Sequence, residues 1–316
     1  MSAIREQNMT IDVMIPTYRP GREFIEILNR LMKQSRPIHK IILINTEESL
    51  LTEPVREAIG KLPEEMAEIY HISKAEFDHA AVRRRGMDCS GADFVLFMTQ
   101  DAVPANDRLL EELSAMLQRD PRIAVAYARQ LPKEGAALTE RCSREFNYPD
   151  RERIKGIDDL PELGVKTFFC SDVCAMYRRD VFYQVGGFEE KAIFNEDMIY
   201  ACKAMRAGYL IGYAARAEVF HSHNYGFWEQ FHRNFDLAVS QADHPEVFEG
   251  ISSEQEGMRM ISRSFQYFAK HKKPWAMVPF LWQCVGRYSG YLLGKRYQRL
   301  PGRVILFCTS NKEYWG

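Results

Sequence analysis

The residues with the clearest potential for chemistry in this sequence are acidic. Asp101 closes the group Thr99-Gln100-Asp101, which comes straight after the apolar run 94–98. Ligands in open α/β sheets bind beyond the carboxyl ends of the strands, and a carboxylate there can hold a divalent cation against a diphosphate. The alternative interpretation is that Asp101 only caps a turn or a helix.

Glu196 and Asp197 are a second acidic group, at the start of a segment with helical character. One of the two carboxylates could act as a general base on a hydroxyl while its neighbour fixes the loop. Two adjacent acids at a helix start could equally well only favour the helix dipole.

Basic and imidazole side chains supply further candidates. His221 and His223 lie two residues apart after an apolar run, so they share a side if the backbone is extended. Either could ligate a cation or contact phosphate, although such a pair is commonly structural. The run from Arg83 to Arg85 could neutralise a diphosphate or could form a solvated face.

These groups need strands and helices to position them, and the pattern predicts both. Short apolar runs and helical periodicities alternate along the first two thirds of the chain, which favours an α/β fold with a mostly parallel sheet flanked by helices. The predicted strands cover 11–15, 40–45, 67–72, 93–98 and 123–128, and the predicted helices cover about 21–31, 52–60, 79–90 and 106–119. Asn106 is the expected cap of the last helix. The polar stretch 130–165 is rich in turn residues and is expected to be a mobile excursion near a site.

Charge is divided unevenly along the chain. The 316 residues carry a net charge of -1, but 257–312 holds eleven basic residues and no Asp or Glu. The rest therefore carries a net charge of -12. The basic segment mixes its charges with aromatic residues such as Trp275, Trp282 and Tyr288, which favours a surface-lying membrane module over a nucleic-acid-binding one. A helical bundle packed on the rest of the protein, or an oligomer contact, is the alternative.

The cysteines and the N-terminal residues indicate the cellular compartment of the protein. Seven scattered cysteines, an odd number, indicate reduced thiols, with Cys170 and Cys174 as buried small residues. The first ten residues lack the cationic start and apolar core of a signal peptide. No apolar run approaches the roughly 18 residues that a spanning helix needs. We expect a cytoplasmic protein that lies peripherally on the inner face of the cell membrane.

Taken in order, the motifs resemble those of family 2 glycosyltransferases with the GT-A fold, and among these the bacterial rhamnosyltransferases of surface polysaccharide synthesis. The resemblance covers nearly the whole chain. The segments that carry it are 15–18, 77–83, 99–102, 171–179, Gly186-Gly187-Phe188, Asn195-Glu196-Asp197 and 221–225. It implies a GT-A catalytic domain over 1–226 and a C-terminal basic, amphipathic helical region over 227–316.

The resemblance also implies roles for individual positions. Pro16, Thr17 and Tyr18 would border the nucleotide of the donor, with Asn45 and Gln100 nearby, and Arg83 would contact that nucleotide. Asp101 would bind the cation, Mn²⁺ or Mg²⁺, with His221 or His223 approaching the metal diphosphate. Asp197 would remove the acceptor proton, with Glu196 beside it.

Some positions depart from the family pattern. Thr99 stands where the first carboxylate of the Asp-x-Asp element is usual, which leaves one acidic ligand. Asn45 stands where an Asp usually recognises the base, and Thr46 or Glu47 could replace it. Asp78 and Ala80 replace an Asn and a Gly.

The function implied is inverting transfer of L-rhamnose from dTDP-β-L-rhamnose to a polyprenyl-diphosphate-linked saccharide. The alternatives are a family 2 transferase that uses UDP-glucose, UDP-galactose or UDP-N-acetylglucosamine, or a non-catalytic module that binds sugar nucleotides. A sugar nucleotidyltransferase is disfavoured, because 16–21 is not the Gly-rich basic loop of those enzymes. The expected partners are the dTDP-sugar, the lipid-linked acceptor and an anionic membrane surface, with a homo-oligomer as a further option and no nucleic acid.

Overall fold

A single mixed sheet forms the centre of the protein. The computed structural model describes residues 9–251 and 253–315, so the expectation about a signal peptide rests largely on residues outside this range. Within the described residues the sheet has nine strands in the order β3-β2-β1-β4-β8-β6-β9-β5, with β7 paired to β9. The strands are β1 Ile11–Tyr18, β2 Lys40–Thr46, β3 Ala67–Ile72, β4 Phe94–Met98, β5 Val103–Pro104, β6 Ile123–Leu131, β7 Arg153–Lys155, β8 Cys174–Arg178 and β9 Leu210–Phe220.

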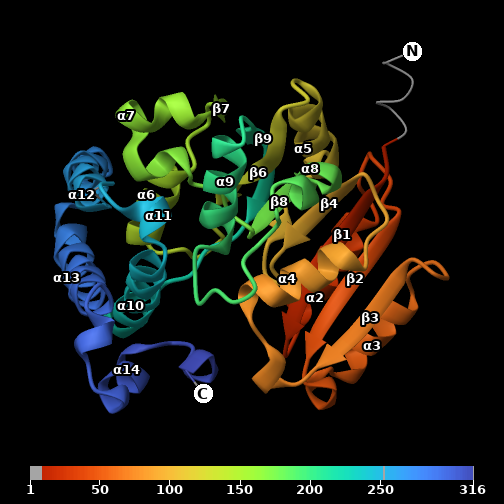
Figure 1. The fold of residues 1–316 in the computed structure, drawn as a ribbon, viewed down its shortest axis with the longest axis horizontal. Coiled ribbons are helices and arrows are strands. Elements are labelled where there is room, and N and C mark those ends of the chain that lie inside the picture. Colours follow the sequence, from red (N-terminus) through yellow and green to blue (C-terminus); the bar gives the residue numbers. More distant parts are fainter. Residues whose placement is uncertain (1–8, 252, 316) are drawn as a thin grey trace.

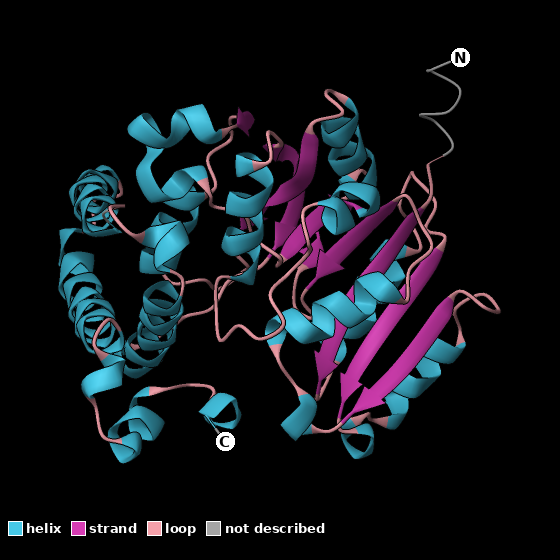
Figure 2. Cartoon of the chain, viewed as in Figure 1, coloured by secondary structure: helices cyan, strands magenta, loops and turns pink. Residues whose placement is uncertain are grey.

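Helices cover both faces of this sheet, and Figure 2 shows the two coverings and a further group of helices beside the sheet. The helices are α2 Arg22–Leu31, α3 Glu53–Gly60, α4 His79–Asp88, α5 Leu109–Gln118, α6 Leu138–Asn147, α7 Leu160–Leu163, α8 Arg179–Gln184, α9 Glu196–Arg206, α10 Phe227–Asp243, α11 Pro245–Phe248, α12 Ser253–Lys270, α13 Met277–Gly294 and α14 Gly302–Cys308. The expected α/β fold is confirmed.

The alternation of side chains along the strands explains the two layers. Val13 and Ile15 of β1 point to a core that also holds the apolar stripes of α2, α3 and α5. Met14 points to the other core, which holds buried residues of α4, α8 and α9. Buried apolar side chains on both faces are typical of strands inside an α/β sheet, and they account for the continuous apolar runs of the sequence.

The sheet is less uniformly parallel than the sequence predicts. β1, β2, β3 and β4 pair in parallel, as do β6 and β9. β8 lies between β4 and β6 and is antiparallel to both, and β5 and β7 are antiparallel to β9. An antiparallel strand that is buried on both faces has the same apolar run as a parallel one, so the sequence does not reveal its direction.

Two local expectations need correction. Helix α5 begins at Leu109 with Arg108 at the N-cap, and Asn106 Oδ1 instead accepts a hydrogen bond from the Arg108 amide within the preceding turn. The stretch 130–165 carries α6, β7 and α7, and α6 is held by a core that Cys142 shares with Phe268 and Phe280. The sequence does not show this order because the partners of α6 lie more than a hundred residues later.

The C-terminal helices lie together on the side of the sheet away from β1–β3, where they run from teal to blue in Figure 1. Phe231, Phe235 and Val239 of α10 pack against Ile193, in the loop that leads to α9. The bundle is therefore continuous with the layer that carries Glu196 and Asp197. Among the described residues, no helix has the length and apolar character to cross a membrane. All seven cysteines are free thiols, and Cys170 and Cys174 are buried as expected.

Candidate functional site

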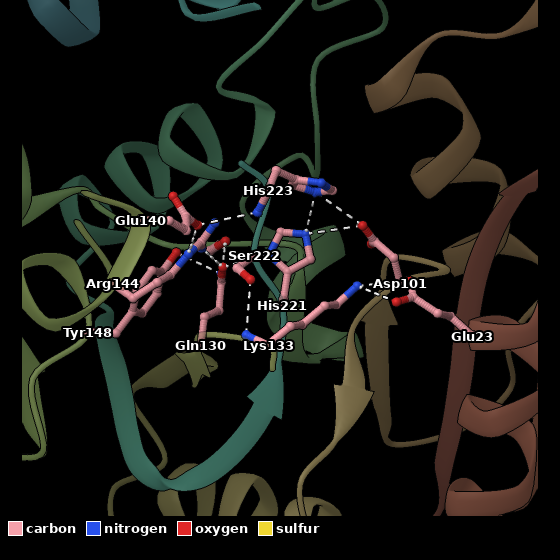
Figure 3. Close-up of polar contacts among 11 residues, drawn as sticks. Glu23, Asp101, Gln130, Lys133, Glu140, Arg144, Tyr148, His221, Ser222 and His223 are labelled. Atoms are coloured by element: carbon pink, nitrogen blue, oxygen red, sulfur yellow. Dashed lines mark hydrogen bonds and ion pairs between the residues drawn. The ribbon is translucent and has the colours of Figure 1, made fainter. Parts of the chain in front are cut away.

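Asp101 and the two histidines converge on one point. Asp101 lies in the loop after β4, and His221 and His223 follow the end of β9. Asp101 Oδ2 is 3.5 Å from His221 Nε2 and 3.1 Å from His223 Nε2, and the two Nε2 atoms are 3.1 Å apart (Figure 3). One carboxylate oxygen and two imidazole nitrogens thus lie within 4.8 Å of one another.

Gln130, at the end of β6, determines which nitrogen of His221 faces this point. The Gln130 amide nitrogen donates to Tyr148 Oη at 2.7 Å and to Ser171 Oγ at 2.9 Å, so its oxygen faces His221 Nδ1 at 3.0 Å. That oxygen also accepts a hydrogen bond from Arg144. An oxygen can only accept, so this network assigns the proton of His221 to Nδ1 and leaves the lone pair of Nε2 directed at Asp101.

Helix α6 holds the second histidine in place. Glu140 Oε1 accepts a hydrogen bond from the His223 amide at 3.3 Å and from Arg144 Nε at 2.7 Å. On its other side the His223 ring stacks on Tyr225, with 5.0 Å between centroids. Part of the 130–165 segment thus lies beside the candidate cation site.

The electrostatics of the cluster favour ligation of a cation. Burial alone would raise the pKa of Asp101, but its interactions with the imidazoles of His221 and His223 outweigh that effect and hold the pKa well below its ordinary range. Burial lowers the pKa of His221, against the opposing effect of Asp101. An ionised carboxylate and a neutral imidazole are the forms that bind metal, so the side chains fit a divalent cation.

A second cluster surrounds the carboxylates at the start of α9. Arg83 of α4 is almost fully buried, and its Nη1 is 2.9 Å from Glu196 Oε1 while its Nε is 3.3 Å from Asp172 Oδ2. Tyr177 Oη donates to the other Asp172 oxygen at 2.6 Å. Arg83 therefore lies between two carboxylates.

Asp197 stands apart from its neighbours because no basic side chain of the described residues forms an ion pair with it. Its Oδ1 accepts from its neighbour, the Met198 amide, at 2.7 Å, and its Oδ2 accepts from the Asp172 amide at 3.3 Å. Burial, followed by the charges of Glu196 and Asp172, raises the pKa of Asp197 well above its ordinary value. A partly exposed carboxyl with a raised pKa and no ion-pair partner has the properties of a general base.

The two clusters meet at the segment 171–173. Gln130, which orients His221, donates to Ser171, and the next residue, Asp172, donates its amide to Asp197. The amide of Thr99, two residues before Asp101, bonds the Val173 carbonyl oxygen at 3.1 Å. One short segment therefore relates the candidate cation site to the candidate base.

The positions expected at the nucleotide lie at the ends of β1 and β2. Thr17 Oγ1 donates to Asn45 Oδ1 at 3.0 Å, and Asn45 Nδ2 lies 3.1 Å from His71 Nδ1. Gln100 makes two hydrogen bonds with the backbone of Tyr18, at 2.9 and 2.8 Å. Pro16 precedes these residues in β1. The structure thus groups Pro16, Thr17, Tyr18, Asn45 and Gln100 at one edge of the sheet, and Gln100 is next to Asp101.

Several residues of these clusters had no role in the sequence-based interpretation. They are Gln130, Glu140, Arg144, Asp172 and Tyr177. Glu140 and Arg144 have a weak signal, since opposite charges four residues apart suggest a helix face. Gln130 and Asp172 act through partners that are remote in the sequence, so their spacing carries no signal.

Comparisons with known proteins identify the family of the chain. The family model for glycosyl transferase family 2 matches residues 12–186. The O-antigen chain rhamnosyltransferase RfbN of Salmonella typhimurium is 33% identical over 311 residues, which cover 97% of this chain and 96% of that protein. The O-antigen chain rhamnosyltransferase WbaN of Salmonella anatum is 34% identical over 308 residues, covering 96% and 95%.

Solved structures extend the likeness to the fold. The mannosyltransferase PcManGT from Pyrobaculum calidifontis, solved in complex with GDP-Man and Mn²⁺, has a TM-score of 0.55 at 14% identity, covering 97% of this chain and 85% of that one. Staphylococcus aureus TarS 1-349 has a TM-score of 0.51 at 14% identity, covering 92% and 91%. At these identities the structures support the shared fold alone.

Proposed function

The chain belongs to glycosyl transferase family 2 and is a glycosyltransferase of the GT-A fold, and we propose that it transfers L-rhamnose from dTDP-β-L-rhamnose, with inversion, to a lipid-linked saccharide. The rhamnosyl donor is supported by the names of two relatives that align over nearly the full length of both chains. The competing donors are UDP-glucose, UDP-galactose and UDP-N-acetylglucosamine.

The observation that carries the mechanism is the difference between Glu196 and Asp197. Glu196 is neutralised by Arg83 at 2.9 Å, whereas Asp197 accepts only backbone amides and has a raised pKa. We assign Asp197 as the base that takes the proton from the acceptor hydroxyl as that oxygen attacks the anomeric carbon. Glu196 and Arg83 then position the start of α9, and this role for Arg83 replaces the expected contact with the nucleotide.

Asp101, His221 and His223 would hold the divalent cation. Such a cation, when bound, neutralises the diphosphate that leaves with the nucleotide. Two imidazole nitrogens beside one carboxylate suit Mn²⁺ better than Mg²⁺, which prefers oxygen ligands. Thr99, which replaces the first carboxylate of the family pattern, leaves this role to the histidines.

The nucleotide would lie along the ends of β1 and β2. Tyr18 is partly exposed there, and Thr17 and Asn45 present a buried hydrogen-bonded pair that can recognise a base edge. Gln100 is hydrogen-bonded to the Tyr18 backbone, so a nucleotide bound there would lie next to Asp101. This arrangement supports binding of a nucleoside diphosphate across the edge of the sheet.

We further propose that the enzyme works at the inner face of the cell membrane, in synthesis of a bacterial cell-surface polysaccharide. The acceptor would be a polyprenyl-diphosphate-linked saccharide. The catalytic part would be 1–226, and 227–316 would approach an anionic membrane surface; a contact between copies of the chain is the alternative for this region.

A pair of substitutions tests the assignment of the base. Asp197→Asn should fold normally and reduce transfer by about 10²–10⁴-fold, which is the usual contribution of a general base. Glu196→Gln keeps Asp197 and should reduce transfer less. The matched control is Asp158→Asn, at an exposed position of a surface turn. Transfer at the wild-type rate by Asp197→Asn would exclude Asp197 as the base.

A further inference from the structure

Four aromatic rings from three helices form a continuous surface feature, called the aromatic ridge below. It consists of Phe227 and Trp228 of α10, Trp282 of α13 and Phe307 of α14. Phe227 stacks on Trp282 with 4.7 Å between ring centroids and touches Trp228 at 5.2 Å, and Trp228 touches Phe307 at 6.1 Å. Each ring thus contacts the next across helix boundaries.

The ridge remains open to solvent in the folded chain. Trp228, Trp282 and Phe307 expose 55%, 60% and 62% of their surface. Val278 and Val285, one turn before and after Trp282 on the same face of α13, are also exposed. The glycine-lined face of α13, next to Trp282, is buried against α10. Aromatic and aliphatic side chains that are exposed next to one another are typical of an interaction surface in a folded protein.

Basic side chains are exposed on and next to the helices that carry the ridge. Arg303 lies one turn before Phe307 on α14, and Lys272 and Lys273 come just before α13. Lys295 and Arg296 follow directly after that helix. These five side chains are exposed, and none forms a salt bridge with another described residue. The whole segment 257–312 has no acidic residue, so its charge is complementary to an anionic surface.

The ridge begins beside the candidate active site. His223 stacks on Tyr225, and Phe227 follows two residues later as the first residue of α10. Gln283 of α13, next to Trp282, donates to the Tyr225 carbonyl oxygen at 3.0 Å. The ridge is therefore connected to the candidate cation ligand His223 through Tyr225.

We propose that the aromatic ridge is the surface by which this protein lies on an anionic lipid bilayer, with the indole rings at the level of the headgroups. Tryptophan favours that level because its ring is apolar while its N–H stays hydrated. The exposed basic side chains of the same C-terminal region add attraction to anionic lipid. The inference rests on the proposed function only in that a lipid-linked acceptor gives the enzyme a reason to lie on the membrane.

Vesicle binding of the full chain tests this. Wild-type protein should sediment with vesicles of phosphatidylglycerol and phosphatidylcholine at low salt, and should bind pure phosphatidylcholine vesicles more weakly. The double variant Trp228→Ser/Trp282→Ser should bind the anionic vesicles on the order of tenfold or more weakly. Tyr183→Ser, an exposed aromatic position on α8, is the control and should bind as the wild type does.

The same proteins are then assayed for transfer to a water-soluble saccharide acceptor, and their mass is measured by analytical ultracentrifugation. The double variant should keep the transfer rate and the mass of the wild type. Equal vesicle binding by the double variant and the wild type, no binding by the wild type, or dissociation of an oligomer by the double substitution would each overturn the proposal. Vesicle binding without transfer from any donor would leave the ridge standing and contradict the proposed function.

Discussion

At the scale of the residue, two adjacent carboxylates differ because their partners differ. Glu196 shares Arg83 with Asp172, and this shared cation offsets part of the cost of burying them. Asp197 receives only amide hydrogen bonds, and these do not outweigh burial and the nearby charges of Glu196 and Asp172, so its anionic form is disfavoured. Carboxyl groups with raised pKa values are typical of functional sites. Such groups commonly lower the stability of the folded protein.

The pKa of Asp197 leads to a prediction about stability. Burial and the charges of Glu196 and Asp172 raise this pKa, so the folded chain keeps the proton at pH values where the unfolded chain, with a carboxyl pKa of about 4, has lost it. The contribution of Asp197 to the free energy of unfolding therefore falls as pH rises above about 4. Asp197→Asn removes this effect and should be more stable than the wild type at pH 8, which would appear as a higher Tm.

The measurement is thermal unfolding at pH 5 and pH 8. The advantage of Asp197→Asn should shrink at pH 5, while Asp158→Asn should follow the wild type at both values. A variant that is less stable than the wild type at pH 8 would contradict the raised pKa.

Gln130 gives a second prediction at this scale. It fixes the tautomer of His221, and loss of such an outer partner usually weakens metal binding by about 10–100-fold. Gln130→Leu should therefore bind Mn²⁺ more weakly by that factor in calorimetric titration, and the wild type should bind Mn²⁺ more tightly than Mg²⁺. Gln298→Leu, at an exposed position, is the control. Unchanged Mn²⁺ affinity in a folded Gln130→Leu protein would remove His221 from the cation site.

At the scale of the element, α10 and α13 are held together by a seam of small residues. Gly286, Gly290 and Gly294 of α13 lie against the backbone carbonyls of Phe227, Phe231 and Phe235 of α10, and the pairs ascend both helices together. The two helices therefore run in the same direction at close approach, which glycine alone permits. This seam fixes the orientation of α13 about its own axis, and in that orientation Trp282 of the aromatic ridge is exposed.

Gly290→Ala tests the seam. A Cβ at this position would overlap the Phe231 carbonyl oxygen, which belongs to a helix backbone and cannot turn aside. We expect the free energy of unfolding to fall by about 1–3 kcal/mol, even though alanine is the better helix former. Gly257→Ala, on α12 with open space around it, should hold or raise stability by up to about 1 kcal/mol. Urea denaturation compares the two variants, and equal stabilities would contradict the close approach.

At the scale of the whole molecule, the parts of the fold that could be predicted are those with local signals. Continuous apolar runs predicted β1, β2 and β4, because strands buried on both faces need them. The direction of β8 and the order inside 130–165 could not be predicted, because they depend on contacts with remote elements. For the site, residue types and motif order identified Asp101, His221, His223 and Asp197, but Arg83 found partners that spacing does not disclose.

The uneven charge of the chain also has a structural explanation at this scale. The basic segment 257–312 is not a separate tail, since α10 joins it to the loop before Glu196 and Asp197 through the core around Phe235. Its exposed charges and rings lie outward, while Phe280 and the three glycines of α13 pack inward. The acidic remainder of the chain contains the candidate catalytic carboxylates. In the proposed function, the basic segment would hold the protein at the membrane, where a lipid-linked acceptor can reach them.

The most direct test of this account is a donor screen with product analysis. Wild-type protein with Mn²⁺ and a polyprenyl-linked saccharide is offered dTDP-β-L-rhamnose, UDP-glucose, UDP-galactose and UDP-N-acetylglucosamine, and the anomeric configuration of the product is read by NMR. We predict that rhamnose is transferred in α linkage and that the UDP-sugars are not used. Turnover of a UDP-sugar without turnover of dTDP-β-L-rhamnose, or a β-linked rhamnosyl product, would contradict it.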